Sequence, residues 1–257
     1  MSSLLQVDAI SKRFGGVQAV SNVSFDVGQN EIYSLIGPNG AGKTTCFNLI
    51  SGIFPLSEGR ITFDGQNLGR VKTHQLAKLG IGRTFQNLAV FKHATVVQNI
   101  LVGRHSHMET DLFSCLFFAP NARGHEKAHR HKVEEIIEFL EIEDIRMQPV
   151  GTLSYGLQKR VELGRALATE PKLLLLDEMV SGMNAEETED IARFILDIKD
   201  ELGISVLMVE HDMGIVMDIS DRVCVLNFGE KIASGTPEEI SKNTAVIEAY
   251  LGHSGGD

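Results

Sequence analysis

The chain has 257 residues and a mass of 28.2 kDa, enough to bury a core of its own within one large α/β domain. Its net charge of −10 and pI near 5.4 argue against a nucleic-acid groove as the main function, because phosphate contacts need clustered Lys and Arg. Three cysteines without C-x-x-C spacing argue against a disulfide framework.

The N-terminus lacks the basic and apolar regions of a signal peptide. No stretch of the sequence approaches the ~20 apolar residues that a membrane-spanning helix requires. We therefore expect a cytoplasmic protein, which would work at a membrane only through a partner.

In chain order, the first predicted elements are two β-rich segments, residues 4–10 and 17–27, which are typical of antiparallel strands. Residues 31–37 predict a buried strand that runs into a Gly-rich turn and then a helix, residues 38–50. Residues 58–66 predict another strand, closed by an Asp-Gly turn.

After a short predicted strand at residues 81–86, the pattern becomes helical, with apolar residues at helical spacing in 95–105 and 131–142. The β/α pattern then resumes with a strand at 171–178, a helix at 184–202, a strand at 204–211 and a hairpin at 222–235. Apolar strands that alternate with helices imply a mostly parallel, covered sheet. The sequence therefore predicts one α/β domain with a helical insertion and a β-rich edge.

Residues 37–44, GPNGAGKT, match the phosphate-loop pattern G-x-x-x-x-G-K-[ST] between a predicted strand and a predicted helix. The glycines let the backbone approach a phosphate closely, so that N–H groups and the helix N-terminus point at negative charge. Lys43 is expected to reach the β- and γ-phosphates and the Thr44 hydroxyl to bind Mg²⁺. A Gly-rich turn without a ligand is the weaker interpretation. The expected nucleotide-binding residues are Gly37, Pro38, Asn39, Gly40, Ala41, Gly42, Lys43, Thr44 and Thr45.

Two adjacent carboxylates, Asp177 and Glu178, end a predicted strand. Because neighbours in a strand point to opposite faces, they should have different roles. Asp177 suits Mg²⁺, directly or through water, and Glu178 could polarise an attacking water. The alternative is a strand that simply ends in charge at the rim of a sheet. The sequence contains no N-K-x-D guanine-reading element and no arginine-rich lid, which argues against a GTPase or a kinase.

Taken together, these residues resemble the ATP-binding subunit of an ABC transporter along essentially the whole chain. Residues 37–44 resemble its Walker A motif, residues 153–167 its signature helix, and residues 173–178 its Walker B strand with the catalytic glutamate. Single positions and short segments also match: Gln86 the Q-loop, residues 181–184 the D-loop, His211 the switch histidine, and Phe14 the aromatic that stacks on adenine.

The resemblance implies a P-loop NTPase (RecA-like) core with an antiparallel β edge and a helical ABC-specific insertion. Within a single domain of residues 1–257, the core and β subdomain would comprise residues 1–86 and 161–257, and the helical subdomain residues 87–160. It also implies ATP hydrolysis that depends on Mg²⁺. The implied catalytic residues are Glu178, His211 and Gln86, and the implied Mg²⁺ ligands are Thr44, Gln86 and Asp177.

The resemblance further implies partners: ABC membrane-spanning permease subunits, a second ATPase subunit (identical or paralogous), and indirectly a substrate-binding protein. No nucleic acid is expected. The chain would then work at the cytoplasmic face of the inner (plasma) membrane, held there by its membrane subunits.

Ser154 and Gly156 stand at the predicted start of the signature helix. In the family this helix N-terminus comes from the opposite subunit and neutralises the outer face of the γ-phosphate, so that each ATP lies between two chains. Taken alone, Ser154 is better interpreted as a plain N-cap. Beside the other motifs, we expect Ser154 and Gly156 to bind ATP.

The sequence departs from the family pattern at four positions. Tyr155 and Leu157 interrupt the usual L-S-G-G-Q, which puts a contact from residue 157 in doubt. Met179 stands where Pro is usual, and Asn184 where Asp is common. Because Asn can still hydrogen-bond across an interface, we expect a changed contact there rather than a lost one.

Within the family, the tyrosine-bearing signature, residues 82–105, the insertion 112–120 and the ending 235–252 are most similar to branched-chain amino acid importers. The cargo stays open between these amino acids and related small compounds such as amides. The apolar segment 112–119 is either a dock for a membrane subunit or ordinary packing between helices.

The sequence disfavours two other functions. A soluble ABC ATPase that acts on DNA or ribosomes usually adds a coiled coil or a second nucleotide domain, whereas this sequence has one phosphate loop and no sustained heptads. A structural dimerisation module that binds ATP without hydrolysing it is disfavoured by Glu178.

Overall fold

The computed structural model describes residues 3–69, 71–84, 88–107 and 121–251. The chain divides into two compact units, Met1–Leu76 with Leu173–Asp257, and Ala77–Lys172. The second unit overlaps the expected helical subdomain, residues 87–160, whose bounds stay a prediction.

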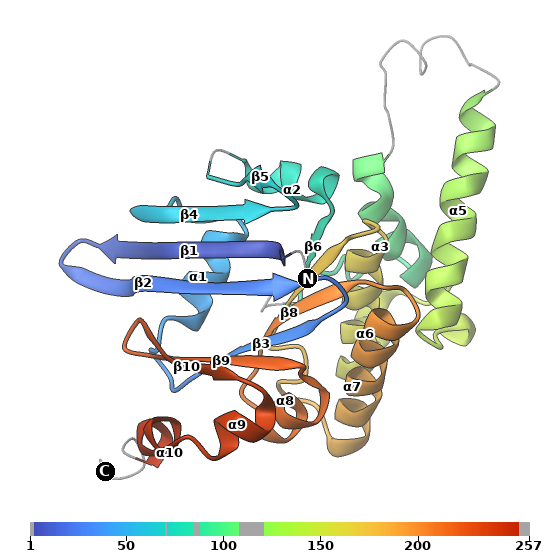
Figure 1. Ribbon diagram of the computed structural model, residues 1–257. Helices are drawn as coiled ribbons and strands as arrows, with labels where there is room; N and C mark the ends of the chain where they lie inside the picture. Colours follow the sequence, from blue (N-terminus) through green and yellow to red (C-terminus); the bar gives the residue numbers. More distant parts are fainter. Residues whose placement is uncertain (1–2, 70, 85–87, 108–120, 252–257) are drawn as a thin grey trace. The chain divides into compact units, whose positions relative to one another are not determined.

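The first unit contains an antiparallel sheet in the order β2-β1-β4-β5 (Figure 1). Its strands are β1 (Ser3–Phe14), β2 (Val17–Gly28), β4 (Glu58–Phe63) and β5 (Gln66–Asn67). Val7 of β1 lies opposite both Phe25 of β2 and Ile61 of β4, and all three side chains are buried. Alternating apolar residues thus give the sheet one buried face, which confirms the predicted β-rich edge.

The same unit contains the parallel strands that position the site. In sheet order these are β10 (Glu230–Gly235), β9 (Arg222–Asn227), β3 (Ile32–Ile36), β8 (Ser205–Val209) and β7 (Leu173–Asp177). All pairs are parallel except β9 with β10. Every residue of β3, β7 and β8 is buried. Because parallel strands share a direction, their carboxyl ends meet at one edge, where ligands bind in such folds.

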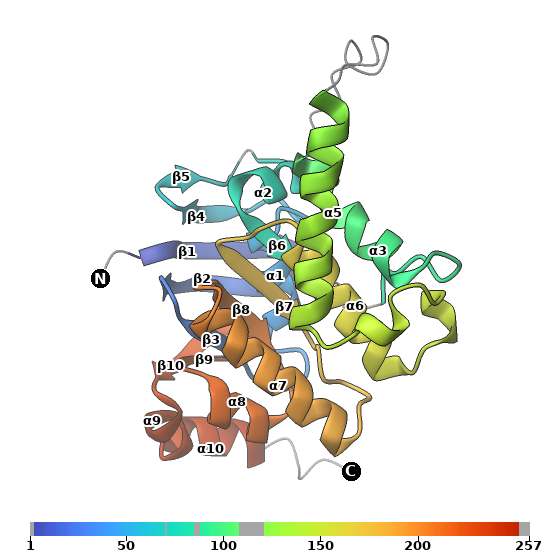
Figure 2. The ribbon, with the colours of Figure 1, turned by 90° about the vertical axis from the view of Figure 1, so that its right-hand side faces the viewer.

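The helices of this unit are α1 (Lys43–Ile50), α7 (Ala185–Asp200), α8 (Met213–Ile219), α9 (Pro237–Ser241) and α10 (Thr244–Leu251). Side chains cap α7, α8 and α9, whereas α1 has no side-chain cap. Asn184 caps α7 and Thr236 caps α9, each within a capping box. Helix α7 buries a stripe at helical spacing, formed by Ile191, Phe194, Ile195 and Ile198. Figure 2 shows α7 and α8 running beside the strands. Helix α2 (Thr73–Leu79) spans the boundary between the two units.

The second unit is mainly helical, as predicted. It contains β6 (Ile81–Arg83), α3 (Val96–Gly103), η1 (Arg104–His107), α5 (Asn121–Phe139), η2 (Glu143–Ile145), η3 (Val150–Thr152) and α6 (Tyr155–Leu167). Two glycines let its helices approach closely. A Cβ on Gly103 would lie 2.2 Å from the Arg165 carbonyl oxygen, and one on Gly164 would lie 2.9 Å from Leu140 and 3.1 Å from Ile100.

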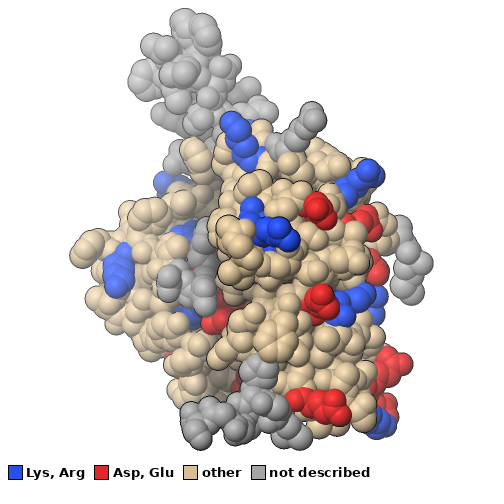
Figure 3. All heavy atoms as spheres, turned by 90° about the vertical axis from the view of Figure 1, so that its left-hand side faces the viewer, with Lys and Arg blue, Asp and Glu red and all other residues tan. Residues whose placement is uncertain are grey.

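One face of the molecule carries acidic and basic side chains interspersed with each other (Figure 3). The chain as a whole has 34 acidic residues against 24 Lys and Arg, which gives its net charge of −10. Within the described ranges, none of the helices has the length and apolar character needed to cross a membrane.

Candidate active site

The phosphate loop follows β3 as a tight turn of residues 37–42 that leads into α1. Gly37, Gly40 and Gly42 have φ values of 148°, 79° and 98°, which favour glycine. A Cβ on Gly37 would lie 2.1 Å from the Leu226 carbonyl oxygen. Helix α1 begins after Gly42, which offers no side-chain cap. The first N–H groups of α1 can therefore be satisfied by an anion.

Lys43 is almost buried, with 5% of its surface exposed. Its ammonium group donates to the carbonyl oxygens of Gly37 at 2.6 Å and Pro38 at 2.9 Å. Burial lowers the pKa of Lys43, and the charge of Glu178 opposes this shift. A second negative charge would favour the ammonium form further, which suits a phosphate ligand.

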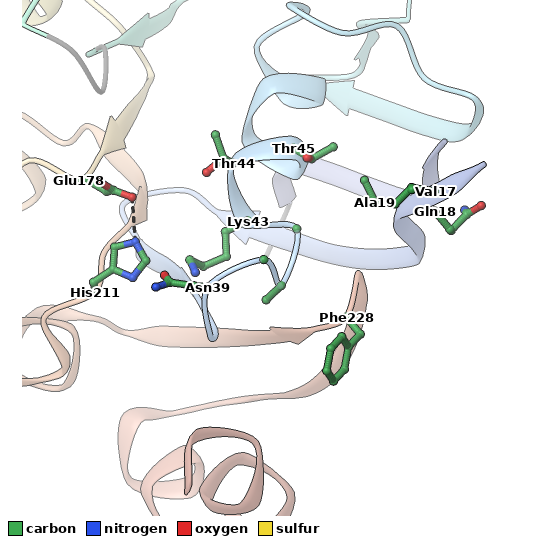
Figure 4. Close-up of a pocket in the computed structure, with 13 residues that line it drawn as sticks. Val17, Gln18, Ala19, Asn39, Lys43, Thr44, Thr45, Glu178, His211 and Phe228 are labelled. Carbon is green, nitrogen blue, oxygen red and sulfur yellow. Dashed lines mark hydrogen bonds and ion pairs between the residues drawn. The ribbon is translucent and has the colours of Figure 1, made fainter. Parts of the chain in front are cut away.

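A cavity of about 510 Å³ extends along the phosphate loop within the first unit. It is lined by Val17, Gln18, Ala19, Asn39, Gly40, Ala41, Gly42, Lys43, Thr44, Thr45, Glu178, His211 and Phe228. In Figure 4, Thr44 lies on the side of α1 toward Glu178, whereas Thr45 lies on the side toward Val17 and Ala19. Of the predicted phosphate-loop residues, Gly37 and Pro38 do not line the cavity, and their carbonyl oxygens accept hydrogen bonds from the Lys43 ammonium.

Glu178 and His211 form a hydrogen-bonded pair at one end of the cavity (Figure 4). The Nε2 atom of His211 lies 2.8 Å from Oε1 of Glu178. Glu178 follows the last residue of β7, and its N–H donates to the Val209 carbonyl at 2.9 Å. Because β7 and β8 are adjacent and parallel, the residues that follow them meet. The sequence predicted both residues, but only the fold brings them together.

Asp177 and Glu178 lie in different surroundings. Asp177 is 1% exposed and does not line the cavity, whereas Glu178 does. Glu178 has φ 51°, a left-handed conformation that is uncommon outside glycine and concentrates at functional sites. This backbone turn lets the chain leave the sheet directly after the buried aspartate.

The other end of the cavity is formed by β2 and by the β9–β10 hairpin turn. Phe228, at the turn, is 76% exposed, and the following Gly229 donates from its N–H to the Ala41 carbonyl at 3.0 Å. Val17 is 68% exposed on the opposite side. Phe228 was not predicted as a site residue, although an aromatic residue before Gly in the predicted hairpin could have indicated it.

Phe14, expected to stack on adenine, is placed outside the cavity lining. Its ring packs edge-on against Phe54 with centroids 5.1 Å apart, and the Lys12 ammonium lies 5.2 Å from its centroid. The ring is 42% exposed. The stacking role of Phe14 therefore stays a prediction.

The remaining predicted site residues lie in or beside the second unit. Ser154 caps α6 by accepting from the N–H of Leu157 at 3.3 Å, and Gly156 is buried. The N-cap interpretation of Ser154 is thus confirmed, and its contact with a second chain's ATP stays a prediction. Gln86 and the segment 112–119 lie outside the described residues.

Two of the unusual positions have structural roles. Met179 is fully buried directly after Glu178. Asn184 accepts at Oδ1 from the N–H of Glu187 at 2.9 Å and thereby caps α7. These contacts stabilise residues 179–184, the segment that follows Glu178.

Comparison with known families decides what kind of protein this is. A model described as ABC transporter matches residues 20–181, and one described as branched-chain amino acid ATP-binding cassette transporter matches residues 230–255. The chain belongs to the ABC transporter family. Its ATP-binding cassette is similar to solved structures of the same kind, which confirms the predicted family and fold class.

Relatives cover the cassette almost completely. The high-affinity branched-chain amino acid transport ATP-binding protein BraF of Pseudomonas aeruginosa is 40% identical over 98% of both chains. LivG of Escherichia coli, with the same description, is 39% identical over 98% of both. The lipopolysaccharide export system ATP-binding protein LptB of Haemophilus influenzae is 35% identical over 97% of this chain and 98% of its own.

Solved structures agree with the fold. The ADP conformation of MJ1267, an ATP-binding cassette of an ABC transporter, is 34% identical with a TM-score of 0.86, covering 98% of this chain and 100% of its own. A nucleotide-free ATP-binding cassette from an ABC transporter is 32% identical with a TM-score of 0.84, covering 97% and 99%.

Proposed function

We propose that this cassette is the ATP-hydrolysing subunit of an ABC importer for branched-chain amino acids. One observation carries the catalytic part: a single cavity joins the phosphate loop to the Glu178–His211 pair. A nucleotide held by the loop would place its terminal phosphate beside a carboxylate that can polarise water.

Binding would rest on the phosphate loop. The N–H groups of residues 40–45 and the start of α1 would cradle the phosphates, and the Lys43 ammonium would exchange its carbonyl partners for phosphate oxygens. Thr44 and Asp177 supply oxygen atoms of the kind that Mg²⁺ prefers, and with Gln86 they would hold this ion. Bound Mg²⁺ would offset the negative charge of the phosphates.

Hydrolysis would use the carboxylate–imidazole pair. Glu178 would accept a proton from the attacking water. His211, with Nε2 at 2.8 Å from that carboxylate, would orient it or, in the nucleotide-bound site, turn that N–H to the γ-phosphate. A second copy of the chain, or a paralogue, would close the site with the N-terminus of its α6, through Ser154 and Gly156. Phosphate neutralisation by a helix N-terminus gives this step its physical basis.

The descriptions of the relatives support the proposed cargo. BraF and LivG are described as branched-chain amino acid transport proteins, and residues 230–255 match a family of the same description. We propose that the chain assembles with membrane-spanning permease subunits at the cytoplasmic face of the plasma membrane, and that a substrate-binding protein delivers the amino acid to them.

The catalytic assignment is tested by Glu178→Gln. Loss of a general base should lower ATP turnover by roughly 10²–10⁴-fold while leaving ATP binding intact. Turnover is measured by phosphate release and binding by fluorescence of a labelled ATP. Glu201→Gln neutralises an exposed carboxylate directly after α7; it is the matched control and should retain parental turnover. Parental turnover in Glu178→Gln would remove Glu178 from this role.

The cargo is tested in vesicles that contain the complex with its membrane subunits. We expect ATP-dependent uptake of labelled leucine, isoleucine or valine, and loss of uptake with Glu178→Gln. An active ATPase whose complex takes up none of the three would retain the ATPase assignment and contradict the cargo.

A further inference from the structure

Glu210 is a buried carboxylate that lies directly between strand β8 and His211, and only 3% of its surface is exposed. It does not line the cavity, so it is not placed to touch a nucleotide. Because burial of a carboxylate is costly unless hydrogen bonds satisfy it, its partners indicate what it holds in place.

Those partners are backbone N–H groups from two different segments. Oε1 of Glu210 accepts from the N–H of Val180 at 3.2 Å. The N–H groups of Met179 and His211 also bond to this side chain. One carboxylate therefore joins the segment that follows Glu178 to the segment that carries His211.

This link begins where the strand pairing ends. Asp177 lies opposite Val209 in the last pair of β7 and β8, and the N–H of Glu178 donates to the Val209 carbonyl. At Glu178 the backbone turns away with φ 51°. Beyond this point the Glu210 carboxylate, in place of a carbonyl of β8, accepts hydrogen bonds from the backbone that follows Glu178. A left-handed non-glycine conformation persists only where the surroundings enforce it.

The backbone that Glu210 binds lies in a buried segment. Met179 is fully buried and Val180 is 6% exposed. Burial raises the pKa of Glu210 to about 7, the three backbone hydrogen bonds oppose this shift, and the nearby charge of Glu178 adds to it. The protonated form of Glu210 is therefore favoured up to about pH 7, and the surrounding N–H groups limit the shift.

We propose that Glu210 is a positioning residue for ATP hydrolysis, which holds Glu178 and His211 at their 2.8 Å separation by binding the backbone beside each of them. The proposal rests on the proposed function, since it assigns Glu210 a role in that same reaction. Glu210 acts through its neighbours and makes no contact with the substrate.

The test compares substitutions of Glu210 in the full chain. Glu210→Met keeps the length of the side chain and removes the acceptors, whereas Glu210→Gln keeps an oxygen in place. We expect Glu210→Met to lower kcat by about 10- to 100-fold, because small misplacements of a catalytic group carry losses of this size. Affinity for a fluorescent ATP should stay within about twofold, since the phosphate loop is unchanged. Glu210→Gln should restore kcat to within about threefold of the parent.

Two controls separate positioning from general loss of stability. Glu31 is another buried carboxylate, 9% exposed and paired with Arg222 outside the cavity. Glu31→Met should lower the melting temperature and leave kcat at the parental value. In a Glu178→Gln background, Glu210→Met should cause a smaller loss of kcat than in the parent, because only His211 is left to be positioned.

A folded Glu210→Met variant with parental kcat would overturn the proposal, and so would an equal loss of kcat in the Glu178→Gln background. If Glu210→Met does not fold, Glu210→Asp decides: its shorter carboxylate keeps the charge but loses reach, and it should lower kcat at unchanged ATP affinity. Parental kcat in Glu210→Asp would then count against the role. If Glu178→Gln itself keeps full turnover, the assignment of Glu178 as the base fails, and the role of Glu210 fails with it. If Glu178→Gln loses turnover while the Glu210 variants keep it, only the role of Glu210 is refuted.

Discussion

Lys43 shows how a single residue prepares the site for phosphate. Its ammonium is buried and held by two carbonyl oxygens of the loop that it follows. This arrangement keeps the charge within reach of the cavity while satisfying its donors. A neutral residue at this position would leave the two carbonyls in place and remove the charge.

We predict that Lys43→Ala weakens nucleotide binding. Hydrogen bonds to charged groups contribute about 1.5–3 kcal/mol, which corresponds to roughly a 10- to 100-fold rise in Kd. The measurement is a titration with a fluorescent ATP. Lys231→Ala is the matched control, because that ammonium binds the Ser24 carbonyl away from the cavity. Unchanged affinity in Lys43→Ala would contradict the phosphate-binding role.

Glu210 makes stability depend on pH. Its pKa is raised from 4.5 to about 7, so between these values the folded chain binds more protons than the unfolded chain. The free energy of unfolding should therefore fall as pH rises from about 4.5 to 7, with a contribution of roughly 1–3 kcal/mol from this group. Denaturant unfolding of the parent and of Glu210→Gln measures this difference. The stability of Glu210→Gln relative to the parent should rise across that window, and a constant difference would contradict the shift.

Single residues also show what the sequence could and could not predict. Lys43 and Thr44 were predictable because the phosphate loop is a local motif with its strand and helix on either side. Glu210 was not, because its partners Met179 and Val180 lie about thirty residues earlier and meet it only through the pairing of β7 with β8. The same pairing decides that Glu178 and His211 meet.

Among the elements, the turn between β3 and α1 is the one whose geometry depends most on glycine. Gly37 faces the Leu226 carbonyl so closely that a Cβ would lie 2.1 Å from it. Gly40 has φ 79°, but a Cβ there would meet nothing within 4 Å. Gly37 is therefore required because a side chain would clash with β9, whereas Gly40 is required only for its backbone conformation.

We predict that Gly37→Ala destabilises the chain more than Gly40→Ala. Gly40→Ala should cost about 1–2 kcal/mol, the usual penalty for a left-handed L-residue. Gly37→Ala adds a clash with a backbone atom, which can be relieved only by moving β9 or the loop. Thermal unfolding of both variants gives the comparison. An equal loss of stability in the two would show that the loop shifts easily.

Most elements were predictable because their apolar residues repeat with a clear period. Helices α8, α9 and α10 were not predicted, although Thr236, Pro237 and Glu239 form a recognisable helix start. Helix α8 has only seven residues, too few to establish a period.

At the scale of the whole molecule, the proposed site depends on the N-terminus of α6 from a second chain. Ser154 is exposed and caps α6, so its hydroxyl has a structural role within one chain. The proposed second role needs another chain, whose terminal phosphate would meet the same helix N-terminus. A cap and a phosphate contact respond differently to charge at residue 154, since Asp is a good N-cap but repels phosphate.

We predict that two chains associate only around ATP. With Glu178→Gln, which should bind ATP without hydrolysing it, light scattering should show a monomer without nucleotide and a dimer with ATP and Mg²⁺. Adding Ser154→Asp should abolish the dimer while keeping the melting temperature within about 1 °C, because the N-cap is retained. Ser154→Ala is the complementary control: it loses the cap and should lower stability by about 1 kcal/mol.

In the parental chain, the specific ATPase rate should rise with protein concentration below the dissociation constant of the dimer, since each site needs a group from the other chain. A rate per chain that stays constant at high dilution, together with parental turnover in Ser154→Asp, would mean that one chain completes its own site. The helix N-terminus of α6 would then serve only as a cap, and the γ-phosphate would have to be neutralised by Lys43 and His211 alone.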